Sequence, residues 1–144
     1  MDKLPLMLNK TLYVIKKSSK GEDLIEINEK SNLKVGDIVK IRIAINSKND
    51  LEFVHLEDMR ASGFEPINVL SKYKWQDGLG YYESTKDTVT DFFFDELPKG
   101  VYTIEYNLRV NNAGKMSNGI STMGCMYAPK FRAHSQSNIV HVNR

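Results

Sequence analysis

Apolar side chains recur at every second position along two long stretches of this chain. Between residues 39 and 45 they alternate with Lys, Arg and Ala, and between residues 102 and 110 they alternate with Thr, Glu, Asn and Arg. Successive side chains of a β-strand point to opposite faces, so this period gives a strand one apolar face and one polar face. Each stretch is therefore predicted to be a strand buried on one side. The apolar positions are Val39, Ile41, Ile43, Ile45, Tyr102, Ile104, Tyr106, Leu108 and Val110.

Further short runs are rich in β-branched and aromatic residues and are bounded by turn-forming clusters. No stretch shows the spacing of three and four positions that a helix needs. Many short strands with frequent turns are typical of a sandwich. We therefore predict one all-β domain over residues 1–144, an antiparallel two-sheet β-sandwich of the immunoglobulin or fibronectin-III type with Greek-key connections. The further runs are 11–16, 24–27, 51–56, 88–94, 119–127 and 139–142.

One local motif narrows the class of sandwich. The turn signal Leu97-Pro98-Lys99-Gly100 directly precedes the strand 102–110, and Tyr102 lies just inside that strand. This order matches the tyrosine corner of Greek-key sandwiches, in which the phenol hydroxyl bonds to the backbone of the preceding connection. The alternative is that Tyr102 is simply a core aromatic. In both cases Tyr102 is a structural residue.

The sequence offers little that could carry catalysis or bind a metal or cofactor. The three histidines, His55, His134 and His141, lack the spacing that brings two imidazoles to one ion. No Gly-x-Ser-x-Gly elbow is present, and the single cysteine, Cys125, lies within a predicted strand, as a small buried hydrophobe does. We predict a protein that is not an enzyme, with no catalytic residues, no cofactor and no metal.

Two pairs of adjacent carboxylates, Glu57-Asp58 and Asp95-Glu96, end predicted strands, where solvated acids are usual. His55 alternates with Leu51 and Phe53, so it is predicted to be a half-buried strand histidine with a hydrogen-bond partner.

Charge and hydropathy narrow the choice of partners. The net charge is only +2 and the lysines are scattered, whereas a nucleic-acid partner calls for a clustered basic face. No apolar run reaches the length of a transmembrane helix, and the first residues lack the apolar stretch of a signal peptide. We predict no nucleic-acid partner and no insertion into a membrane.

Residues 73–82 form the most unusual cluster. It contains the only Trp, Trp75, and three of the seven Tyr, beside glycines. Residues 60–80 show no strand pattern and are predicted to be a long loop, where a sandwich tends to carry its interaction surface. Aromatics with a polar tip bury much area at a small entropic cost, so Trp75, Tyr81 and Tyr82 are candidates for contact with another domain. The alternative, that Trp75 and one Tyr close the end of the sandwich, stays open.

Ordered strings along almost the whole chain resemble the last domain of bacterial α2-macroglobulin-like proteins. This is a macroglobulin-like module of the MG10 type, similar to a receptor-binding domain. The two most specific strings are Tyr81-Tyr82-Glu83-Ser84-Thr85-Lys86-Asp87 and Cys125-Met126-Tyr127-Ala128-Pro129. Others are Val35-Gly36-Asp37, Phe64-Glu65-Pro66, Tyr73-Lys74-Trp75 and Leu97-Pro98-Lys99-Gly100.

The resemblance implies a part in a large peptidase trap. In this family, cleavage of a bait region exposes an internal Cys–Gln thioester, which couples to the attacking peptidase. The final domain packs on the thioester domain and helps to shield the thioester through an aromatic residue, for which Tyr81 and Tyr82 are our candidates. The parent protein is then expected in the periplasm or cell envelope. This chain would be a C-terminal part of it, and target peptidases would be met only by the full-length protein.

The sequence also departs from the whole-protein pattern. It has no Cys-x-Glu-Gln string and no bait region, and Cys125 is followed by Met126-Tyr127, so it is not a thioester cysteine. Gly63 stands where relatives commonly have Cys. By itself the chain is expected not to inhibit peptidases. Two other hypotheses remain: a free-standing immunoglobulin-like module for carbohydrate or a cell-surface protein, and a small enzyme with polar groups converging in a pocket.

Overall fold

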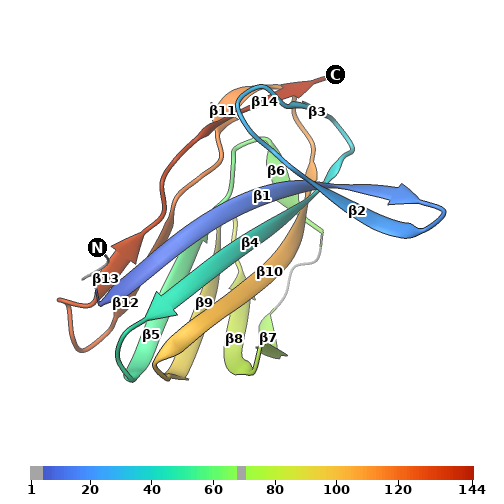
Figure 1. Ribbon diagram of the computed structural model, residues 1–144. Coiled ribbons are helices and arrows are strands. Elements are labelled where there is room, and N and C mark those ends of the chain that lie inside the picture. The colour runs from blue at the N-terminus through green and yellow to red at the C-terminus, as the bar shows by residue number, and fades with distance from the viewer. Residues whose placement is uncertain (1–4, 68–70) are drawn as a thin grey trace.

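Two large β-sheets face each other in the computed structural model, which describes residues 5–67 and 71–144 (Figure 1). The strands are β1 (Leu6–Ser18), β2 (Gly21–Glu26), β3 (Asn32–Lys34), β4 (Ile38–Ser47), β5 (Leu51–Met59), β6 (Phe64–Pro66), β7 (Ser71–Gln76), β8 (Leu79–Thr85), β9 (Val89–Leu97), β10 (Gly100–Val110), β11 (Gly114–Ser117), β12 (Ser121–Cys125), β13 (Arg132–His134) and β14 (Ile139–Asn143). The long strands β1, β4 and β10 have the alternating burial that follows from their alternating sequence, and the apolar faces of the two sheets meet in one core.

One sheet has the strand order β2-β1-β4-β10-β6 and the other β13-β12-β5-β9-β8-β7. The chain passes between them after β4, β5, β6 and β9 and again between β10 and β12, and the β1–β2 hairpin projects beyond the sandwich (Figure 1). A third sheet, β11-β14-β3, includes the parallel pair β14–β3 and was not predicted. The fold is thus the all-β, immunoglobulin-like sandwich that the sequence predicts. Within the described residues, no helix is long and apolar enough to cross a membrane.

The predicted alternation is confirmed in β4 and β10. Ile43 pairs with Ile104 across the two strands, and both side chains are fully buried. The opposite sheet covers them with the aromatic side chains of Phe92 and Phe94 and with Leu56, also fully buried. These contacts form the centre of the core.

Strand β5 breaks the alternation that its sequence suggests. Phe53 has a φ of 54°, and the ladder between β5 and β9 skips Phe53 and the facing Asp95 while keeping the same register on both sides of them. Glu52 and Phe53 are both exposed, so the side chains after this point face the opposite way from the alternation before it. Leu51 therefore points into the core while Phe53 is exposed, and Asp58, predicted to be solvated, becomes fully buried.

The predicted loop over residues 60–80 is wrong in large part. It contains β6, β7 and the start of β8, while its residues 68–70 lie outside the described residues. A two-residue turn joins β7 to β8, and both of its residues, Asp77 and Gly78, have positive φ angles of 55° and 74°. Asp-Gly is the preferred pair for such a hairpin turn, because its left-handed backbone matches the twist of the strands. This signal was present in the sequence and was overlooked.

Candidate functional site

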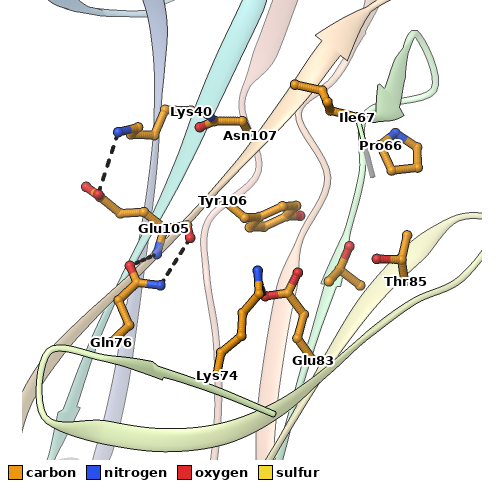
Figure 2. Close-up of a pocket in the computed structure, with 11 residues that line it drawn as sticks. Lys40, Pro66, Ile67, Lys74, Gln76, Glu83, Thr85, Glu105, Tyr106 and Asn107 are labelled. Atoms are coloured by element: carbon orange, nitrogen blue, oxygen red, sulfur yellow. Dashed lines mark hydrogen bonds and ion pairs between the residues drawn. The ribbon is translucent and has the colours of Figure 1, made fainter. Parts of the chain in front are cut away.

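The β7–β8 hairpin is fixed to the opposite sheet by the side chains of Gln76 and Asp77 near its turn, and Figure 2 shows Gln76. β6 pairs with β10 at residues 108–110, and Thr103 and Glu105 lie earlier in β10. There the Thr103 N–H donates to Asp77 Oδ2 at 2.8 Å. The Glu105 N–H donates to Gln76 Oε1 at 2.7 Å, and Gln76 Nε2 donates to the Glu105 carbonyl at 3.3 Å. Because unpaired backbone groups are costly, these bonds brace the hairpin in one position.

A polar cleft of about 360 Å³ opens beside these bonds, between the two sheets. Lys74 Nζ lies 3.1 Å from Glu83 Oε1, and Lys40 Nζ lies 3.8 Å from Glu105 Oε1. Figure 2 shows these ion pairs on different sides of the Tyr106 ring. Since each lysine is matched by a carboxylate of its own sheet, we interpret this cleft as the seam of the sandwich, which the bonds between Gln76 and Glu105 cross.

The structure places the three aromatic candidates differently. Tyr81 is fully buried, with its ring 5.7 Å from that of Phe92 and its hydroxyl accepting a hydrogen bond from Gln76. Burial raises the pKa of Tyr81 above its ordinary value, and the bond from Gln76 offsets this only in part. Tyr81 therefore closes the core, which corrects its prediction as a surface residue. Trp75 and Tyr82 lie on the outer face of the sheet, 77% and 36% exposed.

The Trp75 ring lies flat on Gly80. A Cβ built on Gly80 would be 3.0 Å from two atoms of the indole ring and 3.2 Å from a third, so the indole face occupies the space that any other residue would fill. Tyr73 lies on the same face, donates to Asp95 Oδ2 at 3.0 Å and contacts Tyr82 edge-on, with ring centroids 6.2 Å apart. That hydrogen bond raises the pKa of Tyr73. We call Tyr73, Trp75 and Tyr82 the aromatic shelf.

Tyr102 has the geometry of a tyrosine corner. Its hydroxyl donates to the Pro98 carbonyl at 2.9 Å, which ties β10 to the turn before it.

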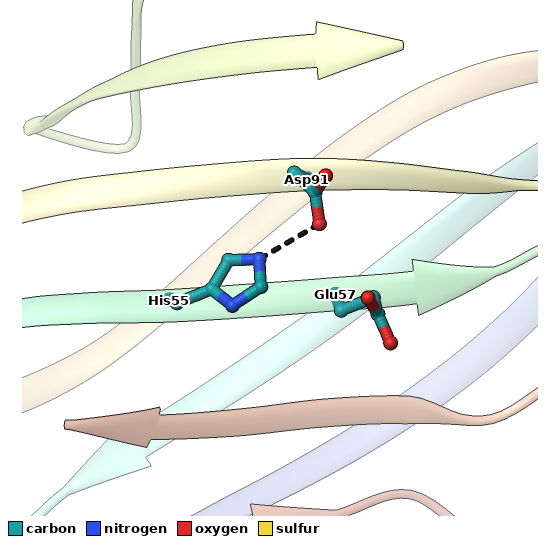
Figure 3. A group of neighbouring side chains, drawn as sticks. All are labelled: His55, Glu57 and Asp91. Atoms are coloured by element: carbon teal, nitrogen blue, oxygen red, sulfur yellow. Dashed lines mark hydrogen bonds and ion pairs between the residues drawn. The ribbon is translucent and has the colours of Figure 1, made fainter. Parts of the chain in front are cut away.

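A second polar group, formed by His55, Glu57 and Asp91, lies on the outer face of β5 and β9 (Figure 3). The ligand atoms of these residues lie within 4.8 Å of one another, as a metal site would require. Asp91 is already engaged, however: His55 Nε2 lies 2.7 Å from Asp91 Oδ1, and Lys86 Nζ lies 2.7 Å from Asp91 Oδ2. His55 also stacks on Phe93 at 4.7 Å. Asp91 is thus held by an ion pair and a hydrogen bond, and His55 is the half-buried, bonded strand histidine that the sequence predicts.

Asp91 is expected to make the free energy of unfolding depend on pH in the acid range. Burial opposes its ionisation, but hydrogen bonds and charges from Lys86 and His55 outweigh burial and hold the pKa of Asp91 below its ordinary value of 3.8. In acid the unfolded chain therefore binds a proton before the folded chain does. This contribution is complete above that ordinary value and is lost as the pH falls through the folded pKa.

Melting temperatures at about pH 5 and about pH 3 test this expectation. The fall between them should be smaller in Asp91→Asn than in the wild type, and smaller also in Lys86→Met, which removes the ammonium group that pairs with Asp91 Oδ2. An equal fall in all three proteins would contradict it.

Sequence reasoning missed a buried ion pair at the centre of the fold. Lys10 Nζ lies 2.7 Å from Asp58 Oδ1, and the two side chains are 1% and 0% exposed. Lys10 also donates to three backbone carbonyls at 3.0, 3.1 and 3.5 Å. Asp58 accepts further hydrogen bonds from Ser121 Oγ at 2.7 Å and from the Tyr106 hydroxyl. Burial, followed by the charge of Asp58, raises the pKa of Tyr106 well above its ordinary value.

The signal for this pair was a lysine at an apolar position of β1. Lys10 stands between Leu8 and Leu12 on the inward-facing side of the strand, in phase with Leu6 and Val14. The sequence marks Lys10 as anomalous, but its partner lies 48 residues away, beyond the break in the alternation at Phe53.

The strand topology and the core define an immunoglobulin-like β-sandwich domain. The sequence model of the bacterial alpha-2-macroglobulin MG10 domain matches residues 6–130, so the chain belongs to this family. No curated protein matches the sequence.

Solved structures agree on the fold. The chain is similar to Salmonella alpha-2-macroglobulin reacted with methylamine, at 15% identity and a TM-score of 0.73, covering 97% of this chain and 9% of that one. It is also similar to native Escherichia coli alpha-2-macroglobulin from domain MG7 to the C-terminus, at 15% identity and a TM-score of 0.72, covering 97% and 24%. A non-cellulosomal cohesin from Archaeoglobus fulgidus has a TM-score of 0.52 at 8% identity, covering 94% and 92%. The chain thus spans a small part of the macroglobulins.

Proposed function

We propose that this chain, as one domain over residues 1–144, is a non-catalytic C-terminal part of a bacterial α2-macroglobulin-like protein that traps peptidases. It packs on the thioester-type domain of the same protein and shields the thioester from water. Peptidases meet the domain only through the full-length protein, which we place in the periplasm or cell envelope. Support for this proposal comes from the family match over residues 6–130.

The observation that carries the packing role is the exposure of Trp75 on a braced hairpin. A large aromatic with one face open to water gains free energy when another surface covers it. Because side chains hold the hairpin in place, little conformational entropy remains to be lost on contact. The apolar contact would exclude water, and a contact of the modest size usual between domains could be released when the trap rearranges.

The polar groups favour a non-catalytic role. Of the histidines, His55 lies beside acids, bonded to Asp91. His134 Nδ1 lies 3.0 Å from the Ser135 carbonyl, and His141 belongs to the separate third sheet. The hypothesis of a small enzyme needs polar groups that converge in a pocket, and among the described residues only one of the three histidines, His55, is bonded to an acid.

The contact is tested by titrating the isotope-labelled chain with the unlabelled thioester-type domain of its parent. Amide and indole resonances of β7 and β8 should shift. Trp75→Ala should weaken binding by about tenfold or more, as expected for a central aromatic. Tyr127→Ala is the matched control, because Tyr127 is 79% exposed on the β12–β13 connection, and it should bind as the wild type does. Shifts centred on Tyr127 would show that the wrong surface was chosen.

Tyr82 replaces Tyr81 in the test of shielding. Where the parent has a thioester, Tyr82→Ala in the full-length protein should release its free thiol faster than the wild type does. Tyr81→Ala is unsuitable, because it would leave a cavity in the core. Unchanged thiol release by Tyr82→Ala would show that Tyr82 is not the shielding residue.

A further inference from the structure

The aromatic shelf borders a hollow with an acidic rim. Tyr73 and Trp75 line this hollow, of about 400 Å³, together with Asp95, Glu96 and Pro98. Both acids are exposed. The hydrogen bond from the Tyr73 hydroxyl holds the Asp95 carboxylate beside the rings. Negative charge and an open aromatic face therefore meet at one place.

The negative charge extends past the shelf. A neighbouring hollow shares Glu96 and Pro98 with the first and adds Asp50 and Glu52. No lysine or arginine is found among the described residues that line either hollow. This differs from the cleft at the seam, where lysines and carboxylates pair off. The rim thus keeps negative charge that a partner can match.

We propose that the shelf binds an arginine side chain presented by a neighbouring domain, an inference that rests on the proposed packing role. The free face of Trp75 offers the π-surface on which a guanidinium stacks, and the face below it is already filled by Gly80. Asp95 and Glu96 supply acceptors for the N–H groups of the same planar fork. Arginine fits better than lysine, because its flat cation can stack on a ring and bond carboxylates at its edge.

Trp75 provides the readout, since it is the only tryptophan and its fluorescence reports on this position alone. The chain is titrated with a short peptide of alternating glycine and arginine, and separately with its lysine and glutamate counterparts. The arginine peptide should change the emission to saturation, the lysine peptide should bind more weakly, and the glutamate peptide should leave the emission unchanged. Binding should weaken as salt is added.

Matched charge variants locate the effect. Asp95→Asn with Glu96→Gln should weaken binding of the arginine peptide by about tenfold, the effect of losing two exposed ion pairs while Trp75 stays in place. Glu22→Gln with Asp23→Asn makes the same charge change on the projecting β2 and should bind as the wild type does. Equal weakening in both double variants, or an equal response to the glutamate peptide, would overturn the inference. If the arginine peptide fails while the thioester-type domain still shifts β7 and β8, the packing role stands and the arginine inference falls.

Discussion

Lys10→Met is expected to lower the free energy of unfolding by about 3–5 kcal/mol, because it leaves a buried carboxylate without its cation. The ammonium group of Lys10 lies 2.7 Å from Asp58, and neither side chain reaches solvent. Ser121 and Tyr106 would still donate to Asp58, but neutral donors do not replace a full charge. Since a domain of this size has a net stability of about 5–15 kcal/mol, the variant should be barely folded.

Urea unfolding of Lys10→Met, Asp58→Asn and the double variant measures the coupling free energy between the two charges. The double variant should lose less stability than the sum of the single variants, with a coupling of up to about 3 kcal/mol, because each single change leaves one buried charge unpaired. Lys40→Met is the control: its partner is Glu105 at 3.8 Å, both side chains are partly exposed, and its cost should stay below about 1 kcal/mol. Additive losses at Lys10 and Asp58 would show that the two charges do not depend on each other.

The class of fold could be predicted because it depends on local periodicity. The alternation in β4 and β10 specifies which face is buried whatever the partner strand is, so both strands lie as expected. Strand β5 shows the limit of that reasoning. The two faces exchange at a residue of positive φ, Phe53, and nothing in a periodic pattern marks where such a break in the alternation will form.

The location of the candidate site could be predicted, but not which of its side chains face the core and which face the surface. The aromatic cluster was found because aromatics gather there in the sequence. Its division into inside and outside follows from strand geometry: adjacent residues point to opposite faces, so of Tyr81 and Tyr82 only one can lie on the surface. The Asp77-Gly78 turn is the feature that would have shown this segment to be a hairpin. The brace by Gln76 depends on the packing of two distant strands and has no local signal.

Gly119→Ala is expected to be as damaging as the loss of Lys10, for a steric reason. A Cβ at this position would lie 1.8 Å from the Met59 carbonyl oxygen and 2.7 Å from its carbon. Both are backbone atoms of β5, so no side-chain rotation can relieve the clash, and the loop before β12 must move. The carbonyl groups of Asn118 and Gly119 in that loop accept hydrogen bonds from Lys10, so movement there also disturbs the buried ion pair.

Gly36→Ala separates the clash from the strain of the backbone. Gly36 also has a positive φ, 100° against 83° for Gly119, but a Cβ there would meet nothing within 4 Å. Gly36→Ala should lower the free energy of unfolding by about 1–2 kcal/mol, because an L-residue is strained in a left-handed conformation. Gly119→Ala should cost more than about 4 kcal/mol or prevent folding, measured by circular dichroism and urea unfolding. If the two variants were equally stable, Gly119 would lie farther from β5 than in the structure, and the hydrogen bonds of Lys10 would tolerate movement of the loop before β12.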